Sequence, residues 1–131
     1  MFRTISELVE RANLEQLPIS EIMIRQEMEL KEQSREEVYE QMERNLVVME
    51  EAIERSLQGV QSVTGLTGGD AVRVQQYMKK REPLSGPILL DAVSKAMGTN
   101  EVNAAMGVIC ATPTAGSAGV VPGTLFAVKD K

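Results

Sequence analysis

The feature that most constrains this sequence is a long stretch almost without charge. Between Leu84 and Val128 the charged residues are Asp91, Lys95 and Glu101. A segment with so few charged groups cannot face water over most of its surface, so we expect other protein to cover it. The whole chain has two Phe, two Tyr and no Trp. Its core must therefore be built from aliphatic and Met side chains, which favours helices packed on helices.

Residues 1–57 have the opposite character, with fourteen acidic and seven basic residues. Such a segment can present wide solvated faces. Two pairs in it, Thr4 with Glu7 and Ser34 with Glu37, have the spacing of a capping box, in which two side chains satisfy free amides at a helix start. The sequence therefore predicts that one helix begins after Thr4 and another after Ser34.

Apolar residues follow each of these starts at helical spacing. Pro18 ends the first helix, and Ser20 is predicted to cap a second helix that precedes the third. The third helix is predicted over residues 35–57. The apolar positions of the first and third helices are Ile5, Leu8, Val9, Ala12, Val38, Met42, Met49, Ile53 and Leu57.

Residues 58–70 interrupt the helical pattern with four glycines, which permit positive φ and close backbone approach. Asp70 is predicted to be the N-cap of a helix over residues 71–80. The chain thus turns through a glycine-rich loop before it returns to helix.

A second interruption places Pro87 at the first position of a strongly apolar helix. Gly98 is predicted to end that helix, and Asn100 to cap a further short one that runs through Ala105. The sequence contains no clearly alternating strand pattern and no internal repeat. We therefore predict an all-α fold: a multi-helix domain over residues 1–131 with glycine-rich loops, in which a charged segment (1–57) precedes an apolar one (58–131).

Residues 112–119, Thr-Pro-Thr-Ala-Gly-Ser-Ala-Gly, form a loop of small residues between two apolar segments. Successive backbone amides in such a loop can face outward as an anion-binding nest, and the hydroxyls of Thr114 and Ser117 add donors. If Gly119 opens the next helix, the positive end of the helix dipole contributes as well. The alternative is a tight turn whose hydroxyls bond the backbone locally. A carboxylate is the natural guest under the first interpretation.

Composition excludes several classes of site. The net charge of −5 and the absence of a basic stripe argue against a nucleic-acid partner. One Cys and no His cannot form a Cys/His metal cage. Cys110 itself lies in an apolar run, where a small buried thiol is the usual outcome. No long apolar segment indicates a signal peptide or a membrane span, so we expect a cytoplasmic location.

Three segments resemble one known family. The run NEVNAAMGVICATPTAGSAGVVPG (residues 100–123) is similar to the Asn-rich, Pro-Thr-Ala-Gly signature of bacterial iron–sulfur L-serine dehydratases. The upstream TGLTGGD (64–70) and the opening FRTISELVERA (2–12) resemble the α subunit of the two-chain form. The similarity spans all 131 residues, which is under half of a typical α subunit. It implies an amino-terminal part of a larger helical catalytic domain.

The resemblance implies the reaction of the intact enzyme, a lyase of serine degradation and gluconeogenesis. A [4Fe–4S] cluster with one open iron acts as a Lewis acid on the serine hydroxyl, and serine loses water to give pyruvate and ammonia. No pyridoxal phosphate (PLP) is used. The cluster cysteines are expected beyond residue 131, so no metal ligand is assigned here. A serine dehydratase β subunit is the expected partner, and this segment alone is expected to be inactive.

The same resemblance assigns substrate-binding positions but identifies no catalytic base. Asn100 and Asn103 match polar positions before the loop, with a helix cap and a solvated side chain as alternatives. Thr64, Gly65, Gly68 and Gly69 match a second loop that could face the same cleft, with a hinge or turn as the alternative for all four. The substrate-binding residues that we predict are Pro113, Thr114, Ala115, Gly116, Ser117, Thr64 and Gly65.

An alternative function of another class is a small acidic helical interaction protein without catalysis. The charged amphipathic helices and the four Met residues at positions 23–49 suit an adaptable binding face. Ordinary core filling is the competing explanation for these Met residues. A monodisperse, cooperatively melting monomer without an exposed apolar patch would support this alternative.

Overall fold

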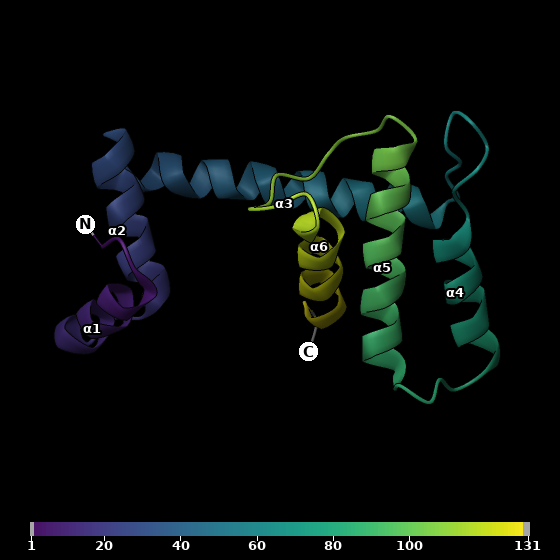
Figure 1. Ribbon diagram of the computed structural model, residues 1–131, viewed down its shortest axis with the longest axis horizontal. Coiled ribbons are helices and arrows are strands. Elements are labelled where there is room, and N and C mark those ends of the chain that lie inside the picture. Colours follow the sequence, from purple (N-terminus) through teal and green to yellow (C-terminus); the bar gives the residue numbers. More distant parts are fainter. Residues whose placement is uncertain (1, 130–131) are drawn as a thin grey trace. The chain divides into compact units, whose positions relative to one another are not determined.

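The computed structural model describes residues 2–129, and within them the only regular elements are six α-helices (Figure 1). An isolated bridge between Gln61 and Gly68 is the sole β-type pairing in this part of the chain. The all-α prediction is confirmed. The helices are α1 (Ile5–Glu15), α2 (Ile19–Lys31), α3 (Arg35–Leu57), α4 (Asp70–Lys80), α5 (Pro87–Ala104) and α6 (Ser117–Val128).

Thr4 and Ser34 both cap their helices as predicted, but only the second capping box closes, because the Glu7 carboxylate accepts from the Arg3 amide at 2.7 Å and not from the Thr4 amide. The amide of Glu7 donates to the Thr4 hydroxyl at 3.2 Å, and the amide of Glu37 donates to Ser34 at 3.2 Å. The Glu37 carboxylate accepts from the Ser34 amide at 2.7 Å, which completes the second box. Helix α3 therefore spans residues 35–57 as predicted. The predicted cap at Ser20 is wrong, because α2 begins at Ile19 and its N-cap is Pro18, which forms no side-chain bond.

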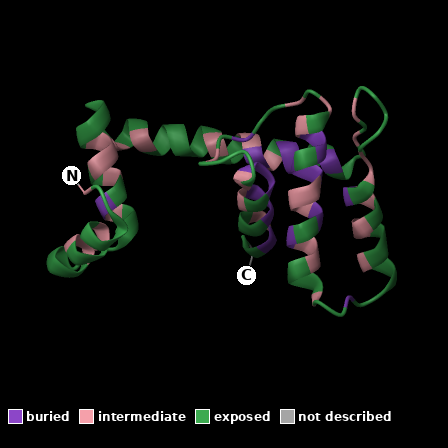
Figure 2. Cartoon of the chain, in the orientation of Figure 1, coloured by how far each residue is buried: buried purple, intermediate pink, exposed green. Residues whose placement is uncertain are grey.

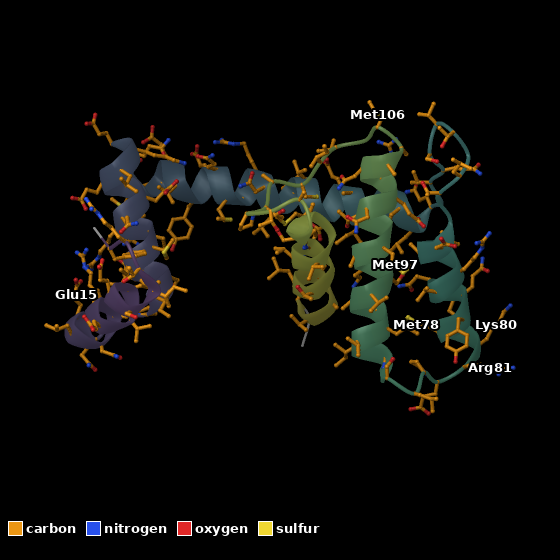
Figure 3. The ribbon with its side chains drawn as sticks, in the orientation of Figure 1. Glu15, Met78, Lys80, Arg81, Met97 and Met106 are labelled. Carbon is orange, nitrogen blue, oxygen red and sulfur yellow. The ribbon has the colours of Figure 1, made fainter. Side chains whose placement is uncertain are left out.

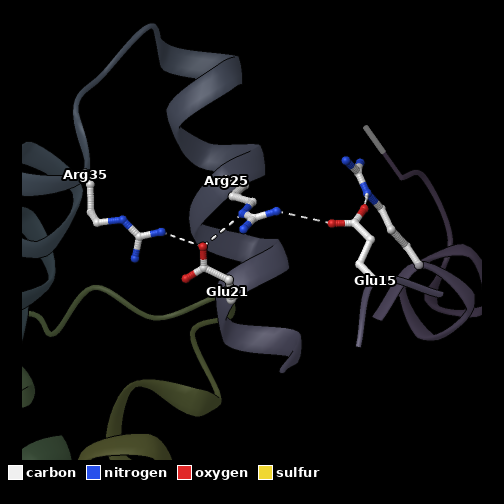
Figure 4. A network of polar contacts seen from close by, with 5 residues as sticks. Glu15, Glu21, Arg25 and Arg35 are labelled. Carbon is white, nitrogen blue, oxygen red and sulfur yellow. Dashed lines mark hydrogen bonds and ion pairs between the residues drawn. The ribbon is translucent and has the colours of Figure 1, made fainter. Parts of the chain in front are cut away.

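Residues 2–44 form one compact unit, made of α1, α2 and the first part of α3. Ile22 is its one buried residue among those described. Charged side chains link the three elements: Arg25 bonds Glu15 at 3.2 Å and Glu21 at 2.9 Å, and Arg35 also bonds Glu21 (Figure 4). Ion pairs at the surface thus connect its helices, beside half-buried apolar side chains such as Leu8, Ile24 and Met28.

Residues 45–129 form the second compact unit. Its helices α4, α5 and α6 lie side by side, with α5 in the middle and antiparallel to both neighbours (Figure 1). The last part of α3 supplies Met49 and Ala52 to a core cluster with Val102 of α5 and Cys110. Buried segments lie along the last part of α3 and along α5 and α6 (Figure 2). Most of the buried residues of the chain belong to this unit.

Helices α5 and α6 approach each other through glycine. A Cβ on Gly119 would lie 2.5 Å from the carbonyl oxygen of Ala96, and one on Gly123 would lie 2.7 Å from the carbonyl oxygen of Ala92. Real Cβ atoms do not come so near to backbone, so only glycine allows this helix spacing. The small residues at four-residue spacing on α6 thus fix its position on α5.

Gly98 has the same role toward α3 and α4, and the prediction that it ends a helix is wrong. It lies inside α5, where a Cβ would meet the Ser56 hydroxyl at 2.1 Å and the Ala71 Cβ at 3.2 Å. The helix continues to Ala104, so Asn100 caps no new helix. None of the helices in residues 2–129 combines the length and apolar character needed to cross a membrane.

Candidate functional site

The two glycine-rich loops meet the same end of the three-helix layer. Helices α4 and α6 begin where α5 ends (Figure 1). The loop of residues 58–69 leads into α4, and the loop of residues 112–116 leads into α6. Two positive helix ends therefore flank the C-terminal turns of α5, on either side of it.

The loop before α6 is exposed but partly bonded to itself. Pro113, Thr114, Ala115 and Gly116 are exposed, and Ser117 is half-buried. The Thr114 amide donates to the Ser117 hydroxyl at 3.0 Å, and the Ser117 amide donates to the Thr114 hydroxyl at 3.2 Å. The Ser117 hydroxyl also bonds the Thr114 carbonyl at 2.8 Å. The hydroxyls are thus engaged locally, as the tight-turn interpretation expects.

The backbone amides of Ala115 and Gly116 differ from these hydroxyls. Within residues 2–129 neither amide has a hydrogen-bond acceptor. Gly116 has φ −66°, and a Cβ built on it would meet nothing within 4 Å. Two adjacent N–H groups of exposed residues at a helix start therefore lack a partner in the described residues, and unpaired amides at a helix N-terminus can bind an anion.

Thr64 and Gly65 lie at the exposed tip of the other loop. The Gly65 amide donates to the Ser62 carbonyl at 2.9 Å, and Ser62 in turn bonds the Thr67 carbonyl at 2.8 Å. Gly65 has φ 71°, a conformation that favours glycine. This tip closes on itself as a turn, so its glycine has a structural reason to be there.

Gly68 and Gly69 have conformational roles as well. A Cβ on Gly68 would lie 2.2 Å from the Val60 carbonyl oxygen, in the narrow neck of the loop. Gly69, with φ 83°, is the N-cap of α4. The prediction that Asp70 caps this helix is wrong, because Asp70 is its first residue.

The cap of α4 comes from Glu101, which the sequence marks only as one of three charged residues between Leu84 and Val128. Its side chain reaches from α5, and Oε1 accepts from the amides of Asp70 at 2.7 Å and Ala71 at 3.3 Å. The residue is only 8% exposed, and its Oε2 has no partner among the described atoms. A carboxylate at the C-terminal end of an apolar helix, without an opposite charge within four residues, was the signal available, since buried charge requires a partner.

Glu101 also lines an open hollow of about 340 Å³ beside the neck of the loop, together with Thr67, Gly68, Asn100 and Ala104. Because its carboxylate already occupies the positive end of α4, an anionic ligand would be repelled there. The start of α6 carries no such internal anion. Of the two predicted loops, the one before α6 is therefore the better anion site.

Asn100 and Asn103 lie on the last turns of α5. The Asn100 side chain is next to Gly119, where an added Cβ would meet its amide nitrogen at 2.7 Å. The Asn103 Oδ1 is buried without a partner in the described part of the chain. Asn100 thus lies between the hollow and the start of α6.

Cys110 is buried, with 2% exposure, in the core cluster. Burial raises the pKa of its thiol, which disfavours the thiolate that metals bind. In residues 2–129 no group of three or more His, Cys, Asp or Glu side chains could hold a metal ion. These residues do not fit a cluster site.

Comparison with known proteins defines the class. The family model for the serine dehydratase α chain matches residues 14–131, and the chain belongs to this family. A probable L-serine dehydratase α chain of Bacillus subtilis is 63% identical over 131 residues, which are all of this chain and 44% of the relative.

Two further relatives agree. An L-serine dehydratase α chain of Peptoniphilus asaccharolyticus is 30% identical over 132 residues, or 45% of its length. A probable L-serine dehydratase α chain of Latilactobacillus sakei is 66% identical over 41 residues, 31% of this chain and 20% of the relative. The chain thus spans less than half the length of these curated relatives and corresponds to an amino-terminal part. No solved structure matches it.

Proposed function

We propose that the protein to which these residues belong converts L-serine to pyruvate and ammonia. The α-proton and the β-hydroxyl leave as water, and the resulting aminoacrylate tautomerises and hydrolyses. Membership of the serine dehydratase α-chain family supports this reaction. The observation that carries the role of this chain is the pair of open amides at Ala115 and Gly116, before a helix start.

These amides would hold the substrate carboxylate. As the α-proton leaves, negative charge spreads from Cα onto that carboxylate. Two N–H donors and the positive end of α6 stabilise the added charge, so they favour the transition state over the ground state. In this proposal the residues that would surround this guest are Pro113, Thr114, Ala115, Gly116 and Ser117, whereas Thr64 and Gly65 lie at the tip of the other loop.

Other parts of the proposal lie outside these residues. A [4Fe–4S] cluster would supply Lewis-acid chemistry without PLP, with its ligands beyond residue 131. The described residues offer no ligand set for it. The relatives are named as α chains, which favours a β-chain partner. We further propose a cytoplasmic enzyme that binds neither nucleic acid nor membrane, and that residues 1–131 alone are inactive.

The test of the reaction uses the full-length α chain with its β chain, prepared anaerobically with iron and sulfide. We expect serine-dependent pyruvate from the complex and none from residues 1–131. The 131-residue chain should also take up no cluster, as measured by iron content after reconstitution. Absence of pyruvate from the cluster-loaded complex would rule out the proposed activity.

A proline substitution tests the amides directly. Gly116→Pro removes one open N–H where φ already suits proline and no neighbour obstructs a side chain. Loss of one hydrogen bond to a charged carboxylate should raise KM for L-serine about tenfold or more. The control Gly116→Ala keeps the N–H and should raise KM less than about threefold. Equal KM values for the two variants would refute carboxylate binding at this amide.

The alternative of an acidic interaction protein finds partial support in residues 2–44. Met23 and Met42 are 46% and 56% exposed, whereas Met49 fills the core of the second unit. The Met residues therefore divide between surface and core. Family membership favours the enzyme, and solution behaviour of the 131-residue chain separates the two: a cooperative monomer without apolar surface would favour the alternative.

A further inference from the structure

The outer sides of α5 and α6 carry exposed apolar residues. We define the α5–α6 surface as Leu89 and Val93 of α5 with Val120 and Val128 of α6. Their side chains are 57%, 39%, 54% and 53% exposed, respectively. Met97, half-buried and labelled in Figure 3, continues the row on α5 one turn beyond Val93. Single exposed apolar residues are common, but a row on two adjacent helices indicates an interface.

Helical spacing places these residues on one side of the layer. On α5, Ala92 and Ala96 meet α6, and Ser94 meets α4 through a 3.1 Å bond to the Ala71 carbonyl. Leu89 and Val93, four residues apart, share a stripe outside both contacts. The α5 part of the surface is therefore turned away from both neighbouring helices.

On α6 the same reasoning applies. Gly119 and Gly123 face α5, and Ala118 and Pro122 are buried. Val120 lies on the flank that these contacts leave open, and Val128 is exposed at the end of the helix. Because α5 and α6 are antiparallel neighbours (Figure 1), the flank with Val120 continues the stripe of Leu89 and Val93.

The chemistry of α6 argues that this surface is buried in the complete protein. Between Ser117 and Val128 the helix has no charged residue. A helix that is apolar on all sides normally lies inside a larger core. Asp91 and Lys95 of α5 do not make this surface polar, because they bond each other at 2.6 Å and Lys95 also bonds the Phe126 carbonyl.

We propose that the α5–α6 surface is covered by an apolar segment of the same α chain, from the part that follows the matched region in the longer relatives. The supporting fact is length: all of this chain corresponds to 44% and 45% of two relatives. More than half of such an α chain therefore lies outside the matched region. The α5–α6 surface is an uncharged surface of residues 45–129 that this remaining part can bury. The proposal rests on family membership and is independent of the substrate.

Side-chain accessibility in the full-length α chain tests this. Val93→Cys and Val120→Cys each place one thiol on the surface, and the native Cys110 is buried. We expect both thiols to react with a maleimide at least about tenfold more slowly in the native full-length chain than in urea. The control Glu40→Cys, at a side chain 67% exposed, should be slowed less than about threefold.

Hydroxyl-radical footprinting of the wild-type chain repeats the test without substitution, in case a variant fails to fold. Protection of Leu89 and Val93 in a dilute, monomeric α chain supports the proposal. Fast reaction there overturns it. Protection that appears only on addition of the β chain, or only with rising α-chain concentration, also overturns it, because the occupant is then a partner or a second copy. None of these readouts depends on serine turnover, so the proposed activity can fail separately.

Discussion

Residues 2–44 and residues 45–129 use different means to hold their helices together. The sequence up to residue 44 has eleven acidic and six basic residues, whereas residues 45–131 have eight of each. In the first unit, ion pairs such as Arg25–Glu15 join the helices around one buried Ile22. In the second, backbones approach closely at glycine and alanine, and a buried carboxylate caps a helix from its neighbour.

The two kinds of packing differ in how well they tolerate substitution. Exposed ion pairs are individually weak and replaceable, because water competes for each partner. A glycine contact between helices has no substitute, since any side chain must displace backbone. The candidate site lies at the end of the second unit, so its amides are positioned by the less tolerant kind of packing.

The largest expected effect comes from Gly123→Ala. A Cβ here would lie 2.7 Å from the Ala92 carbonyl oxygen and 2.7 Å from the Ala96 amide nitrogen. Gly to Ala inside a helix is normally stabilising by about 1 kcal/mol. Here overpacking should reverse the sign and lower the free energy of unfolding by about 2–3 kcal/mol. Urea denaturation followed by circular dichroism measures this.

Gly116→Ala is the matched control for that experiment, because its Cβ meets nothing within 4 Å. Its stability should stay within about 0.5 kcal/mol of wild type or rise slightly. If Gly123→Ala proves as stable as this control, the close approach of α5 and α6 is wrong. The contrast between the two units would then lose its main support.

The second expected effect tests the buried cap. Glu101→Ala leaves the amides of Asp70 and Ala71 without an acceptor and should cost about 2 kcal/mol. Glu101→Gln keeps one carbonyl oxygen and should cost about half as much. Hydrogen exchange at the two amides should accelerate in the Ala variant. An equal effect from Glu82→Ala, at an exposed side chain near the other end of α4, would contradict a specific cap.

Local signals in the sequence were enough to predict the starts of α1 and α3. A capping box needs only residues three apart, so Ser34 and Glu37 predict their own bonds. Gly98 shows where such reasoning fails. A glycine near a helix end usually marks a stop, but this one serves contacts with Ser56 and Ala71, 42 and 27 residues away along the chain.

In the candidate site, too, some features could be predicted from local sequence and others could not. The position of residues 112–116 before a helix followed from their composition, and α6 does begin there, at Ser117 rather than at Gly119. The occupation of the α4 start by Glu101 could not be predicted, because it depends on how α4 and α5 pack. The roles of the predicted substrate-binding residues stay predictions, which the Gly116 variants address.

The smallest expected effect is the response of the first unit, residues 2–44, to a fall in pH. Hydrogen bonds from Arg35 and then Arg25 lower the pKa of Glu21 below its ordinary 4.5, and the bond from the Ser34 amide lowers the pKa of Glu37. A carboxyl whose pKa is lowered on folding stabilises the fold above its unfolded pKa, and this contribution is lost as pH falls through the lowered value.

Acidification below about pH 4.5 should therefore loosen residues 2–44 before it affects the glycine contacts of residues 45–129. Amide chemical shifts followed by NMR from neutral pH downward measure the order of these events. Glu21→Gln should remove part of the pH dependence, whereas Glu36→Gln, at an exposed neighbour of Glu37, should leave it intact. Simultaneous loosening of both units would show that the ion pairs of the first unit and the packing of the second are coupled, and would break the distinction between them.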